Sequence, residues 1–351
     1  MGGTAILEQQ ETAPVILPET AAAEDAELSL ARRLFNPHTL VSLAVAAAII
    51  VFLLTGFDID LGTTWTQIRA SDPWLLAAAV VAFYLSFPLR GVRWLALMSN
   101  VNLGTDRGVS LPPLRQVVLI VLLGWFANCL VPARLGDAYR AYLVKRGAGV
   151  SFSRTVGTIL AERVIDVVVL FSLLLAAAVG VVGGRNTGTA VGLLAVGLGF
   201  VLVLVAGLGV LYRFGGHFER LLPARLRPKF VSMQEGTFQS FQQVPWVVAL
   251  TVAIWILEAT RLYLAASALG ITLELPHALF VALAGSLLTT VPVTPGGLGI
   301  VEAGLAGALV IAVPLLPLQT AVSIAILDRL ISYWSLIGTG LLTFLAFGRR
   351  R

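Results

Sequence analysis

The chain has 351 residues, of which 58% are hydrophobic and only 12% are charged, and its mean hydropathy is +0.90. Soluble domains carry about 25% charged residues, so this composition excludes a soluble globular protein and predicts a polytopic α-helical membrane protein. The net charge of +5 does not indicate a nucleic-acid partner, and the single cysteine, Cys129, excludes an internal disulfide. Three scattered histidines form no metal-ligand cluster, so neither a metal nor a cofactor is expected.

The N-terminal segment 1–38 is predicted to be a disordered acidic tail that ends in a basic flank. Residues 1–30 contain six acidic side chains and no lysine or arginine. Arg32 and Arg33 then precede the first apolar run, residues 39–56. A basic flank at this place puts the N-terminus on the cytoplasmic side.

A loop and a membrane helix follow. Loop 57–72 carries three acids and one arginine, which suits the outer side of the membrane. A helix is predicted over 73–100. Its two arginines, Arg90 and Arg93, are expected to reach toward the inner membrane interface, with their apolar stems along the helix.

The segment 114–147 is predicted to be a re-entrant hairpin that enters the membrane from the cytoplasm. Its apolar run, 116–131, has 16 residues, whereas a full span needs about 20. A full crossing would also place the basic residues that follow it on the outside, against the positive-inside tendency. The tip of the hairpin is expected at the helix break between Pro132 and Gly136.

The rest of the chain continues with further helices and a second broken segment. The predicted elements are a helix over 154–182, a helix over 189–212, a cytoplasmic loop over 213–244, a helix over 245–270, a hairpin over 277–317, a last helix over 319–347 and a basic cytoplasmic C-terminus over 348–351. The second hairpin is expected to enter from the outside and to break between Pro292 and Gly299. Two full spans for this segment would fit the charges equally well.

The order of these parts predicts an inverted repeat, with repeat one over 39–182 and repeat two over 189–347. Each half has a helix that starts with Pro-Trp, a segment broken by proline and glycine, and a long helix with an adjacent acid and arginine. Each half also has three spans, and an odd number makes the halves face opposite ways, as in carriers with alternating access to a midplane site. The predicted fold class is all-α and polytopic, with about six full spans plus two re-entrant hairpins, or eight or so spans if the hairpins cross.

Polar and ionisable residues inside the apolar segments are the candidate functional groups. A charge at the bilayer centre costs about 2.5–3.5 kcal/mol on insertion scales, so these residues are expected to face inward and to pair. The candidate substrate-binding residues are Asn128, Arg134, Asp137, Arg140, Glu162, Arg163, Asp166, Glu302, Asp328 and Arg329. The candidate helix-break or hinge residues are Pro132, Gly136, Pro295, Gly296, Gly297 and Gly299. Glu258 and Arg261, one turn apart, are expected to satisfy each other, and no catalytic residue is predicted.

The two breaks suggest different ligand chemistry. Arg134 and Arg140 flank the first break, where free backbone N–H groups and guanidinium groups together favour an anion. Glu302 follows the second break by one turn and could cap its free N–H groups or bind a cationic head group. For the helix charges at 162–166 and 328–329, a structural ion-pair role and a ligand-contact role are equally open.

These motifs resemble the transmembrane, flippase-like domain of the lysylphosphatidylglycerol synthase family. The resemblance rests on Asn128-x-x-x-Pro132-x-Arg134-x-Gly136-Asp137-x-x-Arg140, Glu162-Arg163-x-x-Asp166 and Pro295-Gly296-Gly297-x-Gly299-x-x-Glu302, and it covers about residues 40–347. It implies a domain that moves charged or glycosylated lipids between leaflets. Members that make aminoacyl lipids carry a soluble catalytic domain after the membrane part, and this chain is expected to be a stand-alone member without that domain.

The function expected from the sequence is that of a lipid translocase, not an enzyme, in the cell membrane with both termini cytoplasmic. The alternatives are a secondary transporter of a small soluble substrate, a membrane-embedded lipid-modifying enzyme and a subunit of an envelope-synthesis complex. The expected partners are a membrane lipid substrate and the bilayer, with no nucleic acid. A homo-oligomer and a separate lipid synthase are open as further partners.

Overall fold

A computed structural model of the chain describes residues 60–103, 110–131, 134–182, 187–289 and 294–349, together with positions 48, 51 and 55. The predicted tail 1–38, most of the apolar run 39–56, the hinge candidate Pro132, the predicted break residue Pro292 and the last two arginines lie outside the described residues.

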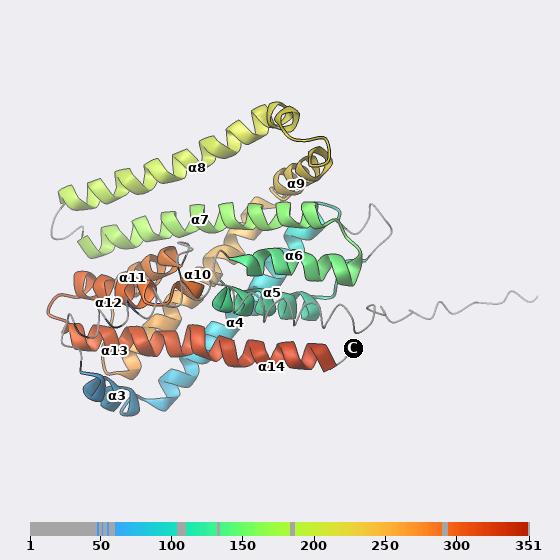
Figure 1. Ribbon diagram of the computed structural model, residues 1–351. Coiled ribbons are helices and arrows are strands. Elements are labelled where there is room, and N and C mark those ends of the chain that lie inside the picture. Colours follow the sequence, from blue (N-terminus) through green and yellow to red (C-terminus); the bar gives the residue numbers. More distant parts are fainter. Residues whose placement is uncertain are drawn as a thin grey trace, which may run out of the picture.

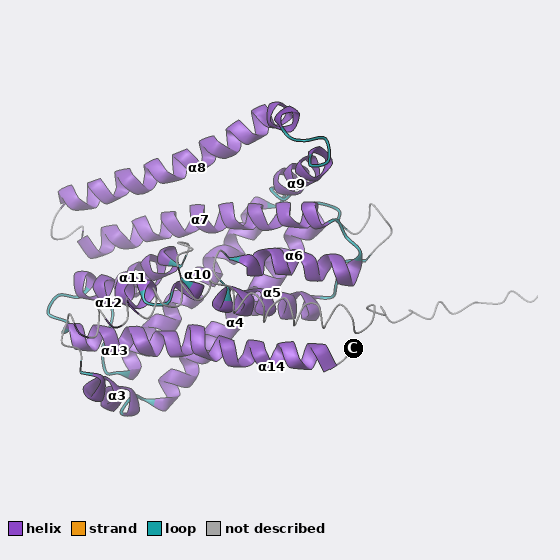
Figure 2. Cartoon of the chain, viewed as in Figure 1, coloured by secondary structure: helices purple, strands orange, loops and turns teal. Residues whose placement is uncertain are grey.

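The described part of the chain is helical and contains no strand, which confirms the all-α prediction (Figure 2). The elements in chain order are α3 (Leu61–Arg69), α4 (Pro73–Asn100), α5 (Leu114–Leu130), α6 (Leu135–Ala148), α7 (Phe152–Val182), α8 (Thr187–Leu221), α9 (Arg227–Gln239), α10 (Val244–Ala268), α11 (Leu275–Leu288), the 3-10 turn η2 (Pro295–Gly297), α12 (Ile300–Ala312), α13 (Leu318–Arg329), the π-helical turn η3 (Leu330–Trp334) and α14 (Ser335–Arg349). Figure 1 shows α7 and the continuous rod of α13 and α14 running along the long axis of the bundle.

Five stretches of the described chain are long and apolar enough to cross a membrane. They are Pro73–Asn100, Phe152–Val181, Val244–Ala268, Pro295–Ala312 and Leu318–Ala346. The fourth reaches 18 residues only because it joins η2 to α12. With the shorter apolar helices α5 and α11 beside them, these stretches make the chain an all-α polytopic membrane protein.

The start of α4 follows from its first residues. The Asp72 carboxylate accepts hydrogen bonds from the N–H groups of Trp74 and Leu75, which have no partner inside the helix. Pro73 occupies the first turn, where its missing N–H costs nothing. The helix therefore begins where the sequence predicts it.

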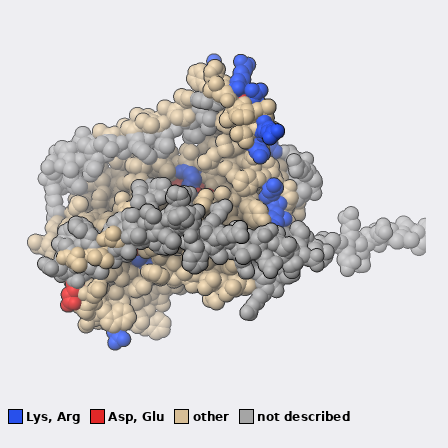
Figure 3. Space-filling model, viewed as in Figure 1, with Lys and Arg blue, Asp and Glu red and all other residues tan. Residues whose placement is uncertain are grey.

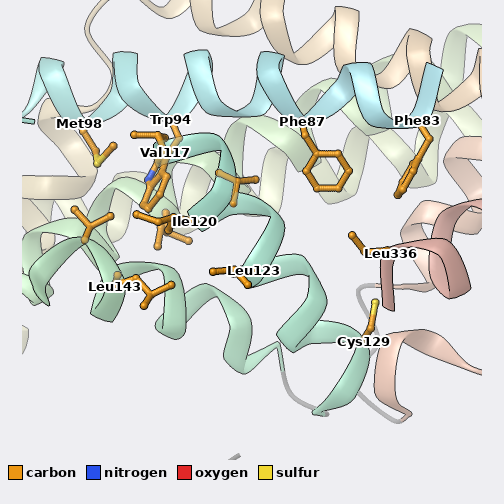
Figure 4. Packing of buried hydrophobic residues seen from close by; sticks show 14 of the residues in the cluster. Phe83, Phe87, Trp94, Met98, Val117, Ile120, Leu123, Cys129, Leu143 and Leu336 are labelled. Atoms are coloured by element: carbon orange, nitrogen blue, oxygen red, sulfur yellow. The ribbon is translucent and has the colours of Figure 1, made fainter. Parts of the chain in front are cut away.

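One side of α4 carries the main apolar core. Phe83, Phe87, Trp94 and Met98 recur at helical spacing and are almost completely buried. Figure 4 shows these side chains projecting from the same side of α4 toward α5. Because α4 also packs along α10, the two helices form the centre of the bundle.

The prediction of a loop over 213–244 is wrong, because α8 continues into this segment and α9 fills much of the rest. The arginines of this segment obscure the helical spacing of its apolar residues. α9 packs against α7 through small residues: a Cβ on Gly157 would lie 2.2 Å from the carbonyl oxygen of Met233. Close backbone contact, rather than a broad apolar stripe, holds α9 in place.

The predicted outer loop 57–72 also contains a helix, α3. Asp60 caps it by accepting hydrogen bonds from the Thr63 hydroxyl and the Gly62 N–H. These two donors favour the ionised carboxylate and lower the pKa of Asp60. The side chain of Gln319 then joins α3 to the start of α13 by donating to the Asp60 carbonyl at 2.8 Å.

The short helices pair as two hairpins, α5 with α6 and α11 with α12. In Figure 1 the first hairpin occupies the half of the bundle in which α14 ends, and the second occupies the half in which α13 begins. The tips of both hairpins lie near the middle of the bundle. α5 has 17 residues, α6 and α11 have 14 and α12 has 13, so their axial lengths are about 20 to 26 Å, less than the ~30 Å of a hydrocarbon core. This pairing follows the prediction of two hairpins, whereas the inverted repeat of the halves stays a prediction.

The first hairpin is held by glycine contact and one side-chain hydrogen bond. A Cβ on Gly136 would lie 1.9 Å from the carbonyl oxygen of Gly124, so α5 and α6 approach there more closely than any other residue allows. The Asn128 side-chain oxygen accepts a hydrogen bond from the N–H of Gly136 at 2.8 Å. Gly136 therefore serves close packing in a helical backbone, while Asn128 satisfies a free N–H at the start of α6.

At the second break the glycines allow an unusual backbone conformation, whereas Gly136 allows close helix packing. Gly296, Gly297 and Gly299 have φ of 57°, 73° and 82°, in the region that side chains with a Cβ rarely adopt. The chain thus turns sharply just before α12, and Gly296 and Gly297 line the cavity described below.

Gly136→Ala should destabilise the protein by about 1–3 kcal/mol, because the new Cβ collides with backbone that cannot move without separating α5 from α6. The measurement is the midpoint of thermal unfolding in detergent. Gly147→Ala is the matched control on the same helix, since its Cβ would meet Gln116 at an ordinary 3.6 Å. Equal midpoints for the two variants would contradict the packing described here.

Candidate functional site

Arg93 of α4 is the centre of a buried network between α4, α6 and α7, and it has no exposed surface. Its guanidinium donates to Asp166, to Glu162 at 3.0 Å and to the Thr251 hydroxyl of α10 at 2.9 Å. The prediction that Arg93 reaches the membrane interface is therefore wrong. Two carboxylates one turn apart on α7 hold it inside the bundle, where an unpaired charge would be costly.

Arg140 ties α6 to α7. Its two terminal nitrogens donate to the two oxygens of Glu162 at 3.2 and 2.9 Å, a bidentate geometry that fixes both side chains. The same guanidinium lies 4.1 Å from the ring centre of Trp94, whose face attracts a cation. Glu162 thus serves Arg140 and Arg93 together, and both of these arginines are buried.

Arg163 makes a second bond between the same helices. It donates to the two oxygens of Asp137 at 3.0 and 2.9 Å, and to Asp166 at 3.3 Å. Asp137 lies in the first turn of α6, where the helix dipole also favours a negative charge. As expected from their spacing, neighbouring Glu162 and Arg163 bind partners on other helices.

A second group of charges joins α4, α10 and α13. Arg90 donates to Glu258 at 2.8 Å, and Arg261 lies 2.9 Å from the other oxygen of Glu258. Arg261 also donates to both oxygens of Asp328, at 2.9 and 3.2 Å. The expected pairing of Glu258 with Arg261 is confirmed. The interface role expected for Arg90 is wrong, because the residue is buried against Glu258 and lies 4.2 Å from the ring centre of Trp125.

A third group fixes the second break. Arg329 donates to Glu302 at 2.9 Å and to the carbonyl oxygen of Gly296 at 2.8 Å. The other oxygen of Glu302 accepts the N–H of Gly299 at 2.7 Å. Glu302 therefore caps the start of α12, which is one of the two roles expected for it, and holds the turn against α13.

The three groups meet around a cavity of about 170 Å³ between the two hairpin tips. Its lining comes from every helix of the two hairpins except α6, and from α4, α7, α10, α13, α14 and the turns. A volume of this size holds on the order of ten water molecules. In Figure 3 charged side chains are visible at the bottom of a hollow near the middle of this face. Among the residues that the structure describes, no cluster of potential metal ligands is present.

Among the arginines that line the cavity, Arg134 has the fewest charged partners. It stands at the tip of the first hairpin, before α6, with a left-handed backbone at φ 52°. Its guanidinium donates to the carbonyl oxygen of Thr289, at the end of α11, at 3.1 Å, and lies 3.3 Å from the Thr289 hydroxyl. Within the described residues it forms no ion pair with a carboxylate, in contrast to the other arginines of the lining.

The structure brings some of the predicted site residues to the cavity wall and places others behind it. Those that line the cavity are Asn128, Arg134, Arg163, Asp166, Gly296, Gly297, Asp328 and Arg329. Those that hold the lining residues from behind are Gly136, Asp137, Arg140, Glu162, Pro295, Gly299 and Glu302. Contact of any of them with a ligand stays a prediction.

Sequence reasoning missed Arg90, Arg93, Trp255, Glu258 and Arg261 as members of the site. One signal was present, because the apolar segments contain more arginines than acids. A buried arginine needs an acidic partner, so Arg90 and Arg93, if buried, had to find acids on distant helices. Trp255 gave no signal, because a tryptophan in an apolar helix is ordinary.

The fold and the site define a polytopic membrane protein with a charged cavity at the middle of its helices. Residues 39–340 match the family described as the lysylphosphatidylglycerol synthase TM region, and the chain belongs to that family. It is 32% identical to a UPF0104 membrane protein of Methanocaldococcus jannaschii over 224 residues, which are 62% of this chain and 93% of that protein. A UPF0104 membrane protein of Methanothermobacter thermautotrophicus is 24% identical over 331 residues, 87% of this chain and 93% of the relative.

A further relative has a different name. The chain is 25% identical to the protein named Glycosyltransferase AglD of Haloferax volcanii over 342 residues. The match covers 86% of this chain but only 53% of that protein. The similarity therefore concerns about half of AglD.

Glu162→Gln should destabilise the protein by about 3–5 kcal/mol, because it leaves Arg93 and Arg140 buried without their shared carboxylate. Thermal unfolding in detergent measures the change. Glu235→Gln is the control, since its ion pair with Arg154 is half exposed and should matter by about 1 kcal/mol or less. A loss for Glu162→Gln no larger than for the control would mean that the network does not hold the helices together.

Proposed function

We propose that this protein is a lipid translocase, which passes a charged or glycosylated head group through the cavity while the acyl chains stay in the membrane. The observation that carries the proposal is the position of the cavity, between the tips of two hairpins that come from opposite ends of the bundle (Figure 1). A polar chamber at that depth gives a head group the partners that hydrocarbon lacks.

The outer surface supports a lipid rather than a fully enclosed substrate. Large apolar side chains are exposed on several helices, including Val81 and Leu85 of α4, Ile311 of α12 and Leu342 of α14. Such side chains suit contact with acyl chains. A substrate with its head group in the cavity and its tails against this surface would remain partly in the bilayer throughout.

The contacts between the hairpins support alternating exposure of the cavity. Ion pairs bind α6 to α7 and α12 to α13, so each hairpin is fixed to its own long helix. The described polar contacts of the first hairpin's tip with the second half include no ion pair: Arg134 donates to the Thr289 carbonyl, and the Tyr333 hydroxyl donates to the Cys129 carbonyl. In the proposal these contacts open while the ion pairs persist, and the predicted inverted repeat supplies two equivalent gates.

The distribution of surface charge supports an orientation. Exposed basic side chains gather at the end of the bundle where α6 and α9 lie (Figure 3). They include Lys145, Arg220, Arg225, Arg227 and Lys229. Under the positive-inside rule this end is cytoplasmic, with the protein in the cell membrane. The proposal names a membrane lipid as the partner and assigns no catalytic step to this chain.

Leaflet exchange in proteoliposomes tests the proposal. Purified protein would be reconstituted with lysylphosphatidylglycerol, phosphatidylglycerol, a glycolipid or a polyprenyl phosphate; the name of the Haloferax relative motivates the glycolipid. Wild type should exchange at least one class, and Arg134→Ala should slow that exchange by tenfold or more because the cavity loses its free positive charge.

Arg227→Ala is the matched control for this variant. Arg227 is exposed and, like Arg134, donates to backbone carbonyls, here those of Leu222 and Arg220, but it lies far from the cavity lining. Exchange should be unchanged in it. Folded wild-type protein that moves none of these lipids would contradict the proposed function and favour a soluble substrate or a role in a complex.

A further inference from the structure

We propose that the cavity is a binding site for a head group with net negative charge, held as an oxyanion by Arg134 and the indole N–H of Trp255. This inference rests on the proposed function and deepens it, because it names the charge of the substrate. It also departs from the cationic head group that the family's name suggests.

The charges around the cavity do not balance. The three groups and Arg134 contain seven arginines, Arg90, Arg93, Arg134, Arg140, Arg163, Arg261 and Arg329, and six carboxylates, Asp137, Glu162, Asp166, Glu258, Glu302 and Asp328. Every carboxylate of the set is in contact with at least one guanidinium. One positive charge therefore remains, and it is located at Arg134, on the cavity wall. A bound monoanion would make this set of charges neutral.

The present partner of Arg134 binds it only weakly. A carbonyl oxygen carries only a partial charge, and the 3.1 Å bond to Thr289 uses one of five N–H donors of the guanidinium. A hydroxyl contact at 3.3 Å adds little. An oxyanion can accept two parallel hydrogen bonds from a guanidinium and would displace these contacts at a net gain.

The indole N–H of Trp255 is an unused hydrogen-bond donor in the described part of the chain. Trp255 of α10 lines the cavity, and its buried indole N–H has no hydrogen-bond partner in the described part of the chain. A buried donor without a partner is costly, so such groups usually face a ligand or water. An oxyanion between Arg134 and Trp255 would satisfy it.

The lining offers fewer free partners to a cationic head group than to an anionic one. Its carboxylates are Asp166, Glu258 and Asp328, and each already accepts hydrogen bonds from one or two arginines. An amine that took one of them would leave a buried arginine unpaired. The site is therefore selective by charge: it supplies free donors and no free carboxylate.

Binding, measured apart from transport, tests this inference. The midpoint of thermal unfolding of the purified protein in neutral detergent would be followed during titration with inorganic phosphate, phosphatidylglycerol, phosphatidylcholine and lysylphosphatidylglycerol. Ligands that bind only the folded state raise the midpoint in a saturable way. The expected order places phosphatidylglycerol above the zwitterionic and cationic lipids, with an apparent affinity at least tenfold higher.

Two variants and one control assign the effect to the site. Arg134→Gln should abolish the preference for the anionic lipid, and Trp255→Phe, which keeps the ring but removes the N–H, should weaken binding several-fold. Arg134→Lys keeps the charge and should retain the preference if Arg134→Gln proves poorly folded. Arg227→Ala should behave as wild type, because it removes an exposed arginine outside the lining.

The outcomes separate this inference from the proposed function. A response to inorganic phosphate as well supports the anion site and shows that the oxyanion alone suffices; a response to phosphatidylglycerol alone supports the site and assigns it to a lipid head group. Equal responses to all lipids, no response to either anion, or a preference undiminished in Arg134→Gln would overturn it. Leaflet exchange without charge preference would refute this inference alone, whereas anion binding without exchange would refute translocation alone.

Discussion

The structure depends on the cost of holding a charged side chain away from water. Arg93 has no exposed surface and is stable there only because Glu162 and Asp166 of α7 reach it. That requirement fixes the distance between α4 and α7. Arg140, which shares Glu162, then fixes α6 against both. The short helix α6 thus owes its place in the bundle to these ion pairs as well as to its buried Ala141, Leu143 and Val144.

The same constraint determines which contacts around the cavity are ion pairs and which are weaker hydrogen bonds. One hairpin is bound to α7 through Arg140 and Arg163, and the other is bound to α13 through Arg329. Arg261 and Asp328 join α13 to α10. The first hairpin's tip, by contrast, meets the second half through two hydrogen bonds to carbonyl oxygens, Arg134 to Thr289 and Tyr333 to Cys129. Strong bonds within each unit and weak ones between the hairpin tips are what a carrier with two gates requires.

Much of this architecture could be predicted from the sequence, because the membrane imposes simple rules on length and charge. Pro73 marked the start of α4, and the short apolar run before Pro132 indicated a hairpin instead of a span. The contacts of the charges could not be predicted so well. Nothing local distinguishes an arginine that extends to the interface from Arg93, whose acids lie about seventy residues away in sequence. Likewise, Glu302 could be recognised as a cap from its spacing, whereas its bond to Arg329 depends on tertiary structure.

The central claim is that the cavity opens to each side of the membrane in turn. Ser286 of α11 lines it and can be replaced by cysteine with little change in shape, in a Cys129→Ala background that removes the single native thiol. The most direct measurement is labelling of Ser286→Cys in oriented proteoliposomes by a membrane-impermeant maleimide added on one side or the other. The account predicts labelling from both sides, with a ratio that shifts when a transported lipid is present. Labelling from one side alone, whatever lipid is added, would contradict it.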